Sequence, residues 1–461
     1  MSGNRERPPD DIRGEAGWYV EHTALLISTL KWALLGAAAG VLVGLGTRGF
    51  LLSLSWATDR VRAMTPAPWP AYIWLPIALP LCVWVIRTFA SDARGHGTEA
   101  VIAAVHQKSG RINWRVAPVK LLGTVITLAA GGSVGKEGPA AQIGAALTSA
   151  AVDLIRLRDD DRRRLVICGI SAGFGAVFGT PVSGALFGIE VLYLGQIDYT
   201  VIFPSLVAGI VGHLACGVHA PFPALAAATM SVTQTREIVL MLVAGVAFGL
   251  IALLLIETMR LVDRLLGPVR GHPYLVAAAS GVFLVALYSV AGDAFAGLGT
   301  DQINAALMAG APVALWVFAV KILATAVTLE TGGSGGILTP IFFIGATAGA
   351  ALAPWLGLPP PFLAAVGFVA VLAAGANTPI AAAVMAMELL PASEGVFAAL
   401  AAATAFLMVG HRSVYSSQRI GLSKSAGLEL DLGGTVGEMR RSDLRLRKGS
   451  IAEKASRFYR R

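Results

Sequence analysis

The chain alternates between long apolar stretches and short polar breaks. A helix that spans a bilayer needs about 20 mostly apolar residues, and several of the apolar stretches reach that length. The stretches of this kind are Ala24–Gly46, Tyr72–Ala90, Ile238–Ile256, Pro273–Ala291, Pro312–Leu329 and Gly395–Gly410. This pattern predicts a polytopic membrane protein built from helices.

Shorter apolar runs lie between these stretches. Most of them are too brief to cross a bilayer alone, which predicts broken or tilted helices packed inside the protein. These runs are Val116–Ala130, Ile143–Val152, Thr200–Cys216, Pro340–Leu356 and Pro379–Leu390.

Composition supports the same class of protein. Of 461 residues, 55% are hydrophobic and only 14% are charged, whereas a soluble domain carries roughly 25% charged residues. The chain therefore has too little polar surface to cover a water-soluble globule of this size. Cys82, Cys168 and Cys216 lie in apolar runs and share no metal-ligand spacing, so we expect buried apolar cysteines and no metal.

The formal net charge is +8, and the basic residues gather in two places. One group lies within 156–164 and the other in the tail 438–461. By the positive-inside rule, both segments are expected in the cytoplasm. We therefore expect a lipid bilayer rather than nucleic acid as the surrounding partner. Residues 1–22 are polar and lack a signal-peptide pattern, so both termini are expected in the cytoplasm, with the plasma (inner) membrane as the location.

Two motifs occur twice along the chain. Gly131–Pro139 aligns with Gly332–Pro340 at an offset of 201 residues, and Thr180-Pro181 followed by Glu190 aligns with Thr378-Pro379 followed by Glu388 at an offset of 198. Two motifs repeated at nearly the same spacing indicate a duplicated chain. The polar segment Ser231–Glu237 marks the predicted junction between the halves.

The repeated glycine runs interrupt apolar segments. In membrane transporters, duplicated halves are often inverted copies whose discontinuous helices meet near the bilayer midplane. Glycine lets the backbone turn there, and a helix N-terminus offers unpaired N–H groups and partial positive charge. The pattern therefore predicts an anion as the substrate.

Four segments, in order, resemble the signatures of the CLC chloride channel and antiporter family. Gly135–Pro139 reads Gly-Lys-Glu-Gly-Pro, and Gly336–Pro340 resembles Gly-x-Phe-x-Pro with Leu338 in the aromatic position. Gly95-His96-Gly97 resembles the start of Gly-Ser-Gly-Ile-Pro, and Tyr415 matches the tyrosine of the pore. Order and spacing agree across roughly residues 93–415.

The resemblance implies an all-α polytopic membrane fold with two inverted structural repeats and many tilted, re-entrant helices. It also implies a homodimer with one anion pathway in each subunit. Because 46 residues follow Tyr415, we expect the bacterial type without a C-terminal CBS domain. The expected division is a cytoplasmic N-terminal segment, a first repeat, a second repeat and a basic cytoplasmic tail, at 1–22, 23–232, 233–420 and 421–461.

Glu137 is the residue that the resemblance makes the gate. Its carboxylate would occupy an anion site when ionised and leave that site when protonated, because a carboxylate competes with the permeant anion. The alternative role is a carboxylate that satisfies backbone N–H groups at a helix start. A charged side chain at membrane depth is by default a functional residue.

The resemblance also implies the residues that bind chloride or a related anion. Tyr415 would donate its hydroxyl, and Ile337 and Leu338 would donate backbone N–H groups. His96 replaces the usual serine, and it either donates a ring N–H to the anion or is a packed or exposed histidine. Because relatives that export fluoride carry other residues at this position, fluoride is not favoured. The complete expected anion-binding set is His96, Gly97, Gly135, Lys136, Gly138, Ile337, Leu338 and Tyr415.

Lys120 and Lys136 are cations near these motifs. Either could raise the local anion concentration, and Lys136 could equally extend its ammonium group to the membrane surface.

The residue after Glu190 bears on whether the protein is a passive channel or a proton-coupled antiporter. Many antiporters of the family carry a second, proton-relaying glutamate there, and this chain has Val191. Valine cannot carry a proton, which favours passive channel-type conduction over proton-coupled chloride antiport. For Glu190 itself we expect a capping or buried structural role.

Other classes fit the sequence less well. A nucleotide-binding loop needs Ser or Thr after Gly-Lys, whereas Glu137 follows Lys136 and would repel phosphate. The motif patterns of hydrolases and metalloproteases are missing from the sequence, so we expect neither enzyme activity nor a cofactor. A cation transporter should show paired acids in its core, and the acids of this chain are dispersed.

Overall fold

The computed structural model describes residues 15–217, 235–308, 313–439 and 443–454. Within these ranges nearly all regular structure is helical, as the apolar pattern predicts. The predicted junction near Thr233 lies outside the described residues. The boundary at residue 22 falls inside a helix, because α1 begins at Glu15.

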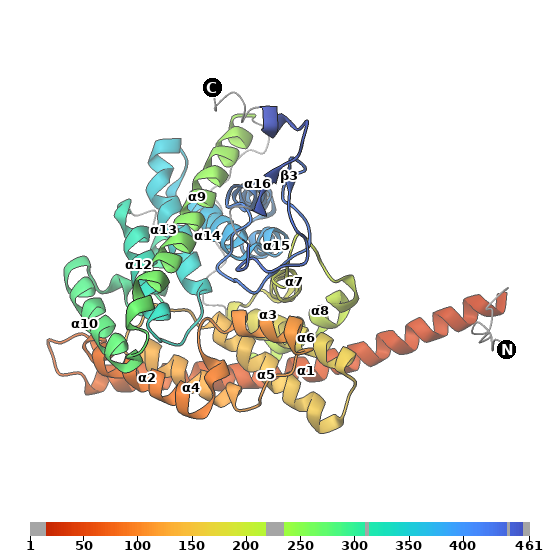
Figure 1. Cartoon of the computed structure of the whole chain (residues 1–461), viewed down its shortest axis with the longest axis horizontal. Helices are drawn as coiled ribbons and strands as arrows, with labels where there is room; N and C mark the ends of the chain where they lie inside the picture. The colour runs from red at the N-terminus through yellow and green to blue at the C-terminus, as the bar shows by residue number, and fades with distance from the viewer. Residues whose placement is uncertain (1–14, 218–234, 309–312, 440–442, 455–461) are drawn as a thin grey trace.

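The first half of the chain supplies eight α-helices, which are drawn from red to yellow in Figure 1. They are α1 (Glu15–Met64), α2 (Leu75–Phe89), α3 (Thr98–Gln107), α4 (Val116–Ala129), α5 (Glu137–Ile155), α6 (Asp159–Phe178), α7 (Pro181–Glu190) and α8 (Ile202–Cys216).

The second half supplies eight more, drawn from green to blue. They are α9 (Thr235–Leu266), α10 (Pro273–Ala291), α11 (Thr300–Met308), α12 (Trp316–Glu330), α13 (Leu338–Leu356), α14 (Pro360–Ala376), α15 (Pro379–Leu389) and α16 (Ala392–Met408). The described residues also form five short 3-10 helices, at Ala71–Trp74, Ser91–Ala93, Tyr199–Val201, Gly267–Val269 and Asp293–Phe295. Four two-residue strands complete the described structure, with β1 (Tyr193–Leu194) parallel to β2 (Arg419–Ile420) and β3 (Leu428–Glu429) antiparallel to β4 (Arg445–Leu446).

Six helical segments among the described residues are long and apolar enough to cross a membrane: Trp18–Met64, Ala71–Phe89, Tyr199–Cys216, Thr235–Val269, Pro273–Ala291 and Leu338–Leu356. The last of these is buried along most of its length by the helices around it. Other apolar helices are too short to span. Of the runs predicted to be too short, Val116–Ala129 and Pro379–Leu389 form such short helices, whereas Tyr199–Cys216 and Leu338–Leu356 reach spanning length.

Contacts between repeat-related residues show how the halves are arranged. Gly135 pairs with its repeat counterpart Gly336 in an antiparallel bridge, in which each N–H donates to the other carbonyl at 2.6 Å. A residue that pairs with its own counterpart lies beside a twofold axis. The two repeats are therefore inverted copies that meet at their glycine motifs.

The pair α7 and α15 follows the same symmetry, and Figure 1 shows these helices side by side. The carboxylate of Glu190, at the end of α7, accepts backbone N–H groups of Ile380 and Ala381 at the start of α15, at 3.0 and 2.8 Å. The carboxylate of Glu388 in α15 accepts those of Val182 and Ser183 in α7, at 3.0 and 2.9 Å. Each repeat thus caps a helix of the other, which confirms the expected capping role of Glu190.

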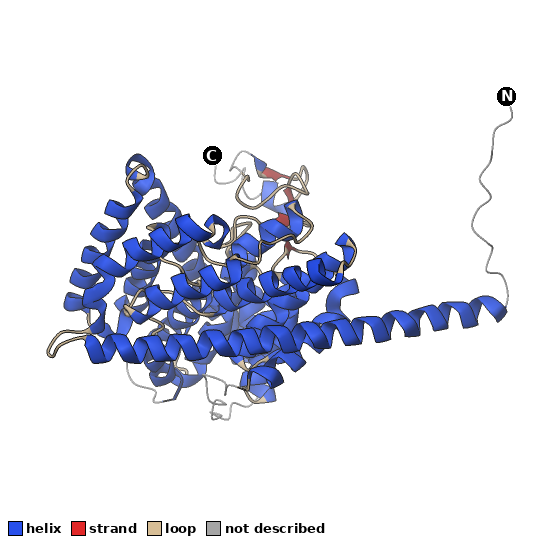
Figure 2. Ribbon diagram, turned by 90° about the horizontal axis from the view of Figure 1, so that it is seen from below, coloured by secondary structure: helices blue, strands red, loops and turns tan. Residues whose placement is uncertain are grey.

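Helix α1 runs the whole length of the molecule, and Figure 2 shows its first turns projecting beyond the body. Its 50 residues far exceed the length that a bilayer requires. Lys31 bonds to Asp161 of α6 at 2.7 Å, near the point where α1 leaves the body. From Trp32 onward α1 contributes buried residues to the packing against α6 and α8.

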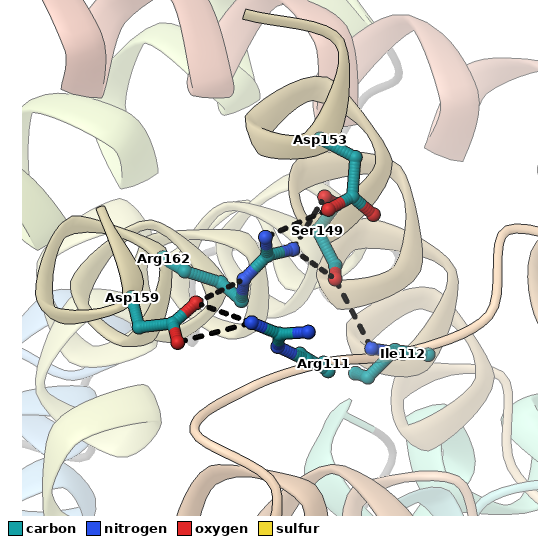
Figure 3. Close-up of polar contacts among 6 residues, drawn as sticks. All are labelled: Arg111, Ile112, Ser149, Asp153, Asp159 and Arg162. Carbon is teal, nitrogen blue, oxygen red and sulfur yellow. Dashed lines mark hydrogen bonds and ion pairs between the residues drawn. The ribbon is translucent and has the colours of Figure 1, made fainter. Parts of the chain in front are cut away.

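The turn between α5 and α6 is held by an ion-pair network, shown in Figure 3. Arg162 is buried and donates to Asp153 at 2.7 Å and to the Ser149 carbonyl at 3.2 Å. Arg111, on the loop before α4, donates to both carboxylate oxygens of Asp159 at 3.1 and 3.0 Å. One arginine of the basic cluster, Arg162, is therefore paired, and together with Arg111 it joins three segments of the chain.

This network predicts a dependence of stability on pH. Hydrogen bonds from Arg111, together with the charges of Arg111 and Arg162, hold the pKa of the Asp159 carboxyl below its usual range. A lowered pKa in the folded state stabilises the fold above the unfolded-state pKa of about 3.9, and that contribution disappears as pH falls through the folded value. We expect Asp159→Asn to lower the unfolding midpoint in detergent at pH 7, and the difference from the wild type to vanish on acidification below about pH 4.

Asp160→Asn is the matched control, since Asp160 is exposed and forms no ion pair among the described residues. If the unfolding midpoints of wild type and Asp159→Asn differed by the same amount at pH 7 and below about pH 4, this role of the carboxylate would be contradicted.

Candidate anion site

Two helix N-termini from opposite repeats meet in the interior of the protein. Helix α5 begins at Glu137 and α13 begins at Leu338, and the bridge between Gly135 and Gly336 joins the two turns that precede them. Both turns are buried. Unpaired N–H groups and the positive ends of two helix dipoles are thus concentrated in a region shielded from solvent, which favours a negative group.

A third segment touches this junction, and glycine is required for the contact. Gly97 has φ = 82°, and a Cβ on it would lie 2.5 Å from the Gly138 carbonyl oxygen. A Cβ on Gly138 would in turn collide with the His96 carbonyl oxygen. The Gly95–Gly97 turn therefore packs backbone to backbone against the start of α5. The structure brings together three signatures that are dispersed along the sequence.

Glu137 occupies the junction. Its side chain is 1% exposed, and its Oε2 accepts the Thr339 backbone N–H at 3.1 Å and the Thr339 hydroxyl at 2.5 Å. Thr339 is in the first turn of α13, so the carboxylate of one repeat lies at the helix N-terminus of the other. A carboxylate there takes the place that a small anion would take at the same donors.

Tyr415 approaches the same junction from the C-terminal segment. It is fully buried, and its hydroxyl makes no hydrogen bond to any described residue. The Thr98 hydroxyl lies beside it and also lacks a partner of normal geometry within the described chain. Glu137 is close enough to Tyr415 to interact electrostatically. Two buried hydroxyl groups without partners near a carboxylate are suitable donors for a dehydrated anion.

Glu99 holds the Tyr415 segment in place. Its Oε1 accepts the Ser416 hydroxyl at 2.6 Å and the Ser417 backbone N–H and hydroxyl at 2.9 and 2.7 Å. The pair Thr98-Glu99 stands where the family signature has Ile-Pro. In this chain, Glu99 in place of proline links α3 by hydrogen bonds to the segment that carries Tyr415.

His96 faces a cavity of about 550 Å³, which we call the His96 cavity. Its ring is partly exposed, its Nδ1 has no partner among the described residues, and its Nε2 lies 4.0 Å from Oε1 of Glu330. Glu99 and Ser416 also line this cavity. His96 belongs to the Gly95–Gly97 turn that packs against the start of α5, so it connects this cavity with the backbone beside the anion junction.

The remaining predicted residues take different positions. The Ile337 and Leu338 side chains are fully buried at the start of α13. Lys136 precedes Glu137 and is half-buried. Lys120 is fully buried, and its ammonium donates to the Ala93 and Gly95 carbonyls at 3.2 and 2.5 Å.

Lys120 therefore fixes the turn that carries His96, a structural role that the sequence did not predict. Its repeat counterpart Lys321 donates in the same way to the Phe295 and Gly297 carbonyls at 3.0 and 2.9 Å. Saturating an ammonium with carbonyl oxygens offsets the cost of burying it.

Val191 is buried, and its carbonyl accepts the Gln418 side-chain amide at 2.9 Å. Its side chain has no group that titrates. Glu190 beside it is occupied, because both of its carboxylate oxygens accept N–H groups of α15. These contacts make Glu190 a poor substitute for a proton-relaying residue.

Sequence reasoning missed Glu330. It ends the apolar helix α12 directly before the Gly332-Gly333 motif, and its side chain is 21% exposed in the His96 cavity. A carboxylate at the end of a long apolar run was the available signal. The internal repeat gave no help, because Ala129 occupies the equivalent position of the first half.

Facing helix N-termini, a buried carboxylate between them and two inverted repeats define a membrane protein that transports anions. The family model for the voltage gated chloride channel matches residues 77–410. The chain therefore belongs to this CLC family.

Curated relatives agree in class and differ in mechanism. A "Chloride/fluoride channel protein" of Pseudomonas syringae pv. tomato (strain ATCC BAA-871 / DC3000) is 37% identical over 415 residues, which cover 88% of this chain and 90% of the relative. An "H(+)/Cl(-) exchange transporter ClcA" of Salmonella arizonae (strain ATCC BAA-731 / CDC346-86 / RSK2980) is 28% identical over 383 residues, which cover 77% of this chain and 80% of the relative.

Solved structures share the fold. A CLC-type fluoride/proton antiporter superimposes with a TM-score of 0.79 at 24% identity, covering 85% of this chain and 98% of that one. A slow cyanobacterial Cl⁻/H⁺ antiporter gives a TM-score of 0.71 at 19% identity, covering 82% of this chain and 94% of that one. The names of the relatives and structures support anion transport. They fit proton-coupled exchange at least as well as the passive conduction favoured by the sequence.

Proposed function

We propose that this protein is a proton-coupled antiporter that exchanges a small halide, chloride or fluoride, for protons across the membrane. The position of Glu137 carries the proposal. Its carboxylate is held by donors at the N-terminus of α13, where an anion would bind. An arriving anion must displace this carboxylate, and the displaced side chain is stable in the interior once it has taken up a proton. One proton binding step is thereby tied to one anion binding step.

Glu330 supplies the second titratable group that antiport needs. It faces the His96 cavity, and its carboxyl can take up a proton, which the Val191 side chain cannot do. The nearby His96 ring completes a pair of groups that can exchange a proton. The preference for a passive channel rested on Val191 alone, and Glu330 supplies the missing acid at another position.

Both halides remain candidates. The relative at 37% identity is named for chloride and fluoride, which supports testing fluoride against the preference drawn from His96. The free hydroxyls of Tyr415 and Thr98 suit a strongly hydrated anion, because such an anion needs strong donors to replace its water.

We further propose that the protein is a homodimer in the plasma membrane, with both termini in the cytoplasm. Arg163 of the basic cluster and Arg419, just before the C-terminal tail, line a common pocket, which supports placing the cluster and the start of the tail on one side of the membrane.

Proteoliposomes loaded with chloride or fluoride test the mechanism. An outward anion gradient should drive protons inward against their own gradient, so the external solution becomes alkaline as the anion-selective electrode records efflux. Anion efflux without proton movement would restore the channel interpretation. No efflux of either halide would contradict halide transport itself.

Glu330→Gln should retain anion efflux and lose the uphill proton movement, because glutamine cannot carry the proton. Glu438→Gln, in the exposed part of the tail, is the matched control and should behave as the wild type. Unchanged proton coupling in Glu330→Gln would place the second proton site elsewhere.

A further inference from the structure

A second cavity, of about 250 Å³, opens between the end of α2 and the turn that joins α9 to α10. We call it the Arg94 pocket. Arg87, Arg94 and Arg270 line it together with apolar side chains, which include Val83, Ile86 and Val276. The pocket is therefore amphipathic, with guanidinium groups and an aliphatic wall in one cavity.

The charge in this pocket is not balanced. Arg87 and Arg94 are exposed, and neither forms an ion pair with another described residue. Arg270 pairs with Asp263 outside the pocket lining. Glu330 at the inner end is the one carboxylate of the lining, and it interacts electrostatically with Arg94 and Arg270. With Arg270 paired to Asp263, the two arginines Arg87 and Arg94, unpaired within the described chain, outnumber the single carboxylate of Glu330, and the pocket attracts a further anion.

The pocket opens at the level where two membrane-spanning helices end. Helix α2 finishes at Phe89 and α10 starts at Pro273, and both helices qualify as spans. Trp84, Phe89 and Tyr274 are exposed on these helices. Exposed aromatic side chains at helix ends are typical of the membrane–water interface, where phospholipid head groups lie.

We propose that the Arg94 pocket binds the head group of an anionic phospholipid. Its phosphate would lie among the guanidinium groups of Arg87, Arg94 and Arg270, and the first part of its acyl chains would cover Val83, Ile86 and Val276. Basic pockets between membrane helices bind anionic lipid head groups in this manner. A free phosphate ion would satisfy the arginines but leave the aliphatic wall in water, so the lining favours a lipid.

The location connects the lipid with the anion site. Glu330 lines both the Arg94 pocket and the His96 cavity. A phosphate in the pocket would place negative charge near this carboxylate and favour its protonated form. Lipid binding itself does not depend on which ion the protein transports, so the binding test stands apart from the transport assay.

Native mass spectrometry of the detergent-purified protein tests the proposal. Phosphatidylglycerol is titrated against phosphatidylcholine with the same acyl chains, and phosphatidylglycerol should bind more tightly. Arg87→Gln and Arg94→Gln should each weaken that binding by about fivefold, because a basic residue near the head group contributes roughly 1 kcal/mol. Arg115→Gln is the matched control, since Arg115 is also exposed and lies beside a tryptophan, outside the pocket.

Val276→Trp provides a second test that leaves the charges intact. The larger side chain should fill the cavity and reduce phosphatidylglycerol binding as the arginine variants do. Equal binding of the two lipids, or a loss that is the same in Arg115→Gln, would overturn the proposal. Displacement of the bound lipid by inorganic phosphate would also overturn it, since the site would then recognise phosphate alone.

Discussion

Replacing Glu137 with alanine is expected to abolish proton uptake while anion efflux continues. In the proposed mechanism, the carboxylate that accepts hydrogen bonds from Thr339 is the group that takes up the proton and competes with the anion. Without it, the N-terminus of α13 is open to the anion at all times. The measurement is the ratio of proton to halide flux in proteoliposomes, and it should fall to the value of empty vesicles.

Halide affinity gives an independent readout of the same variant. A charge at a helix N-terminus is worth about 0.3–2 kcal/mol, so removing the competing carboxylate should tighten anion binding by roughly twofold to thirtyfold. Titration calorimetry with chloride and fluoride measures this change, and Glu438→Gln serves as control. Weaker binding of both halides in Glu137→Ala would show that the carboxylate supports the site instead of competing for it.

Removing Glu190 should destabilise the protein far more than removing its counterpart Glu388. Glu190 is 5% exposed and satisfies two N–H groups of α15, of which that of Ala381 is buried, whereas Glu388 is exposed. A buried donor left without a partner costs about 1–3 kcal/mol, while water can replace the lost bonds at the exposed site. We expect the free energy of unfolding to fall by about 2–4 kcal/mol in Glu190→Ala and by about 1 kcal/mol or less in Glu388→Ala.

Hydrogen exchange locates the effect within the molecule. Amide protection should fall at Ile380 and Ala381 in Glu190→Ala, and at Val182 and Ser183 in Glu388→Ala. Thermal unfolding in detergent then compares the two variants. Equal destabilisation by both substitutions would mean that burial does not govern the strength of these reciprocal caps.

The sequence by itself determined the class of structure. Insertion into a bilayer depends on local apolar length, and short-range patterns carry that information directly. The two glycine motifs also predicted where helices begin, because glycine and the following proline restrict the backbone locally. The duplication was visible in the same motifs, and the family resemblance singled out Glu137 within one of them.

Only the tertiary structure decided which groups meet. Lys120 is near the anion signatures in sequence, yet its ammonium binds two carbonyls of the turn that carries His96. Glu330 and His96 are 4.0 Å apart although they are far apart along the chain. The partners of Glu190 belong to the other repeat. Contacts between distant segments depend on how whole helices pack, and no local pattern specifies that packing.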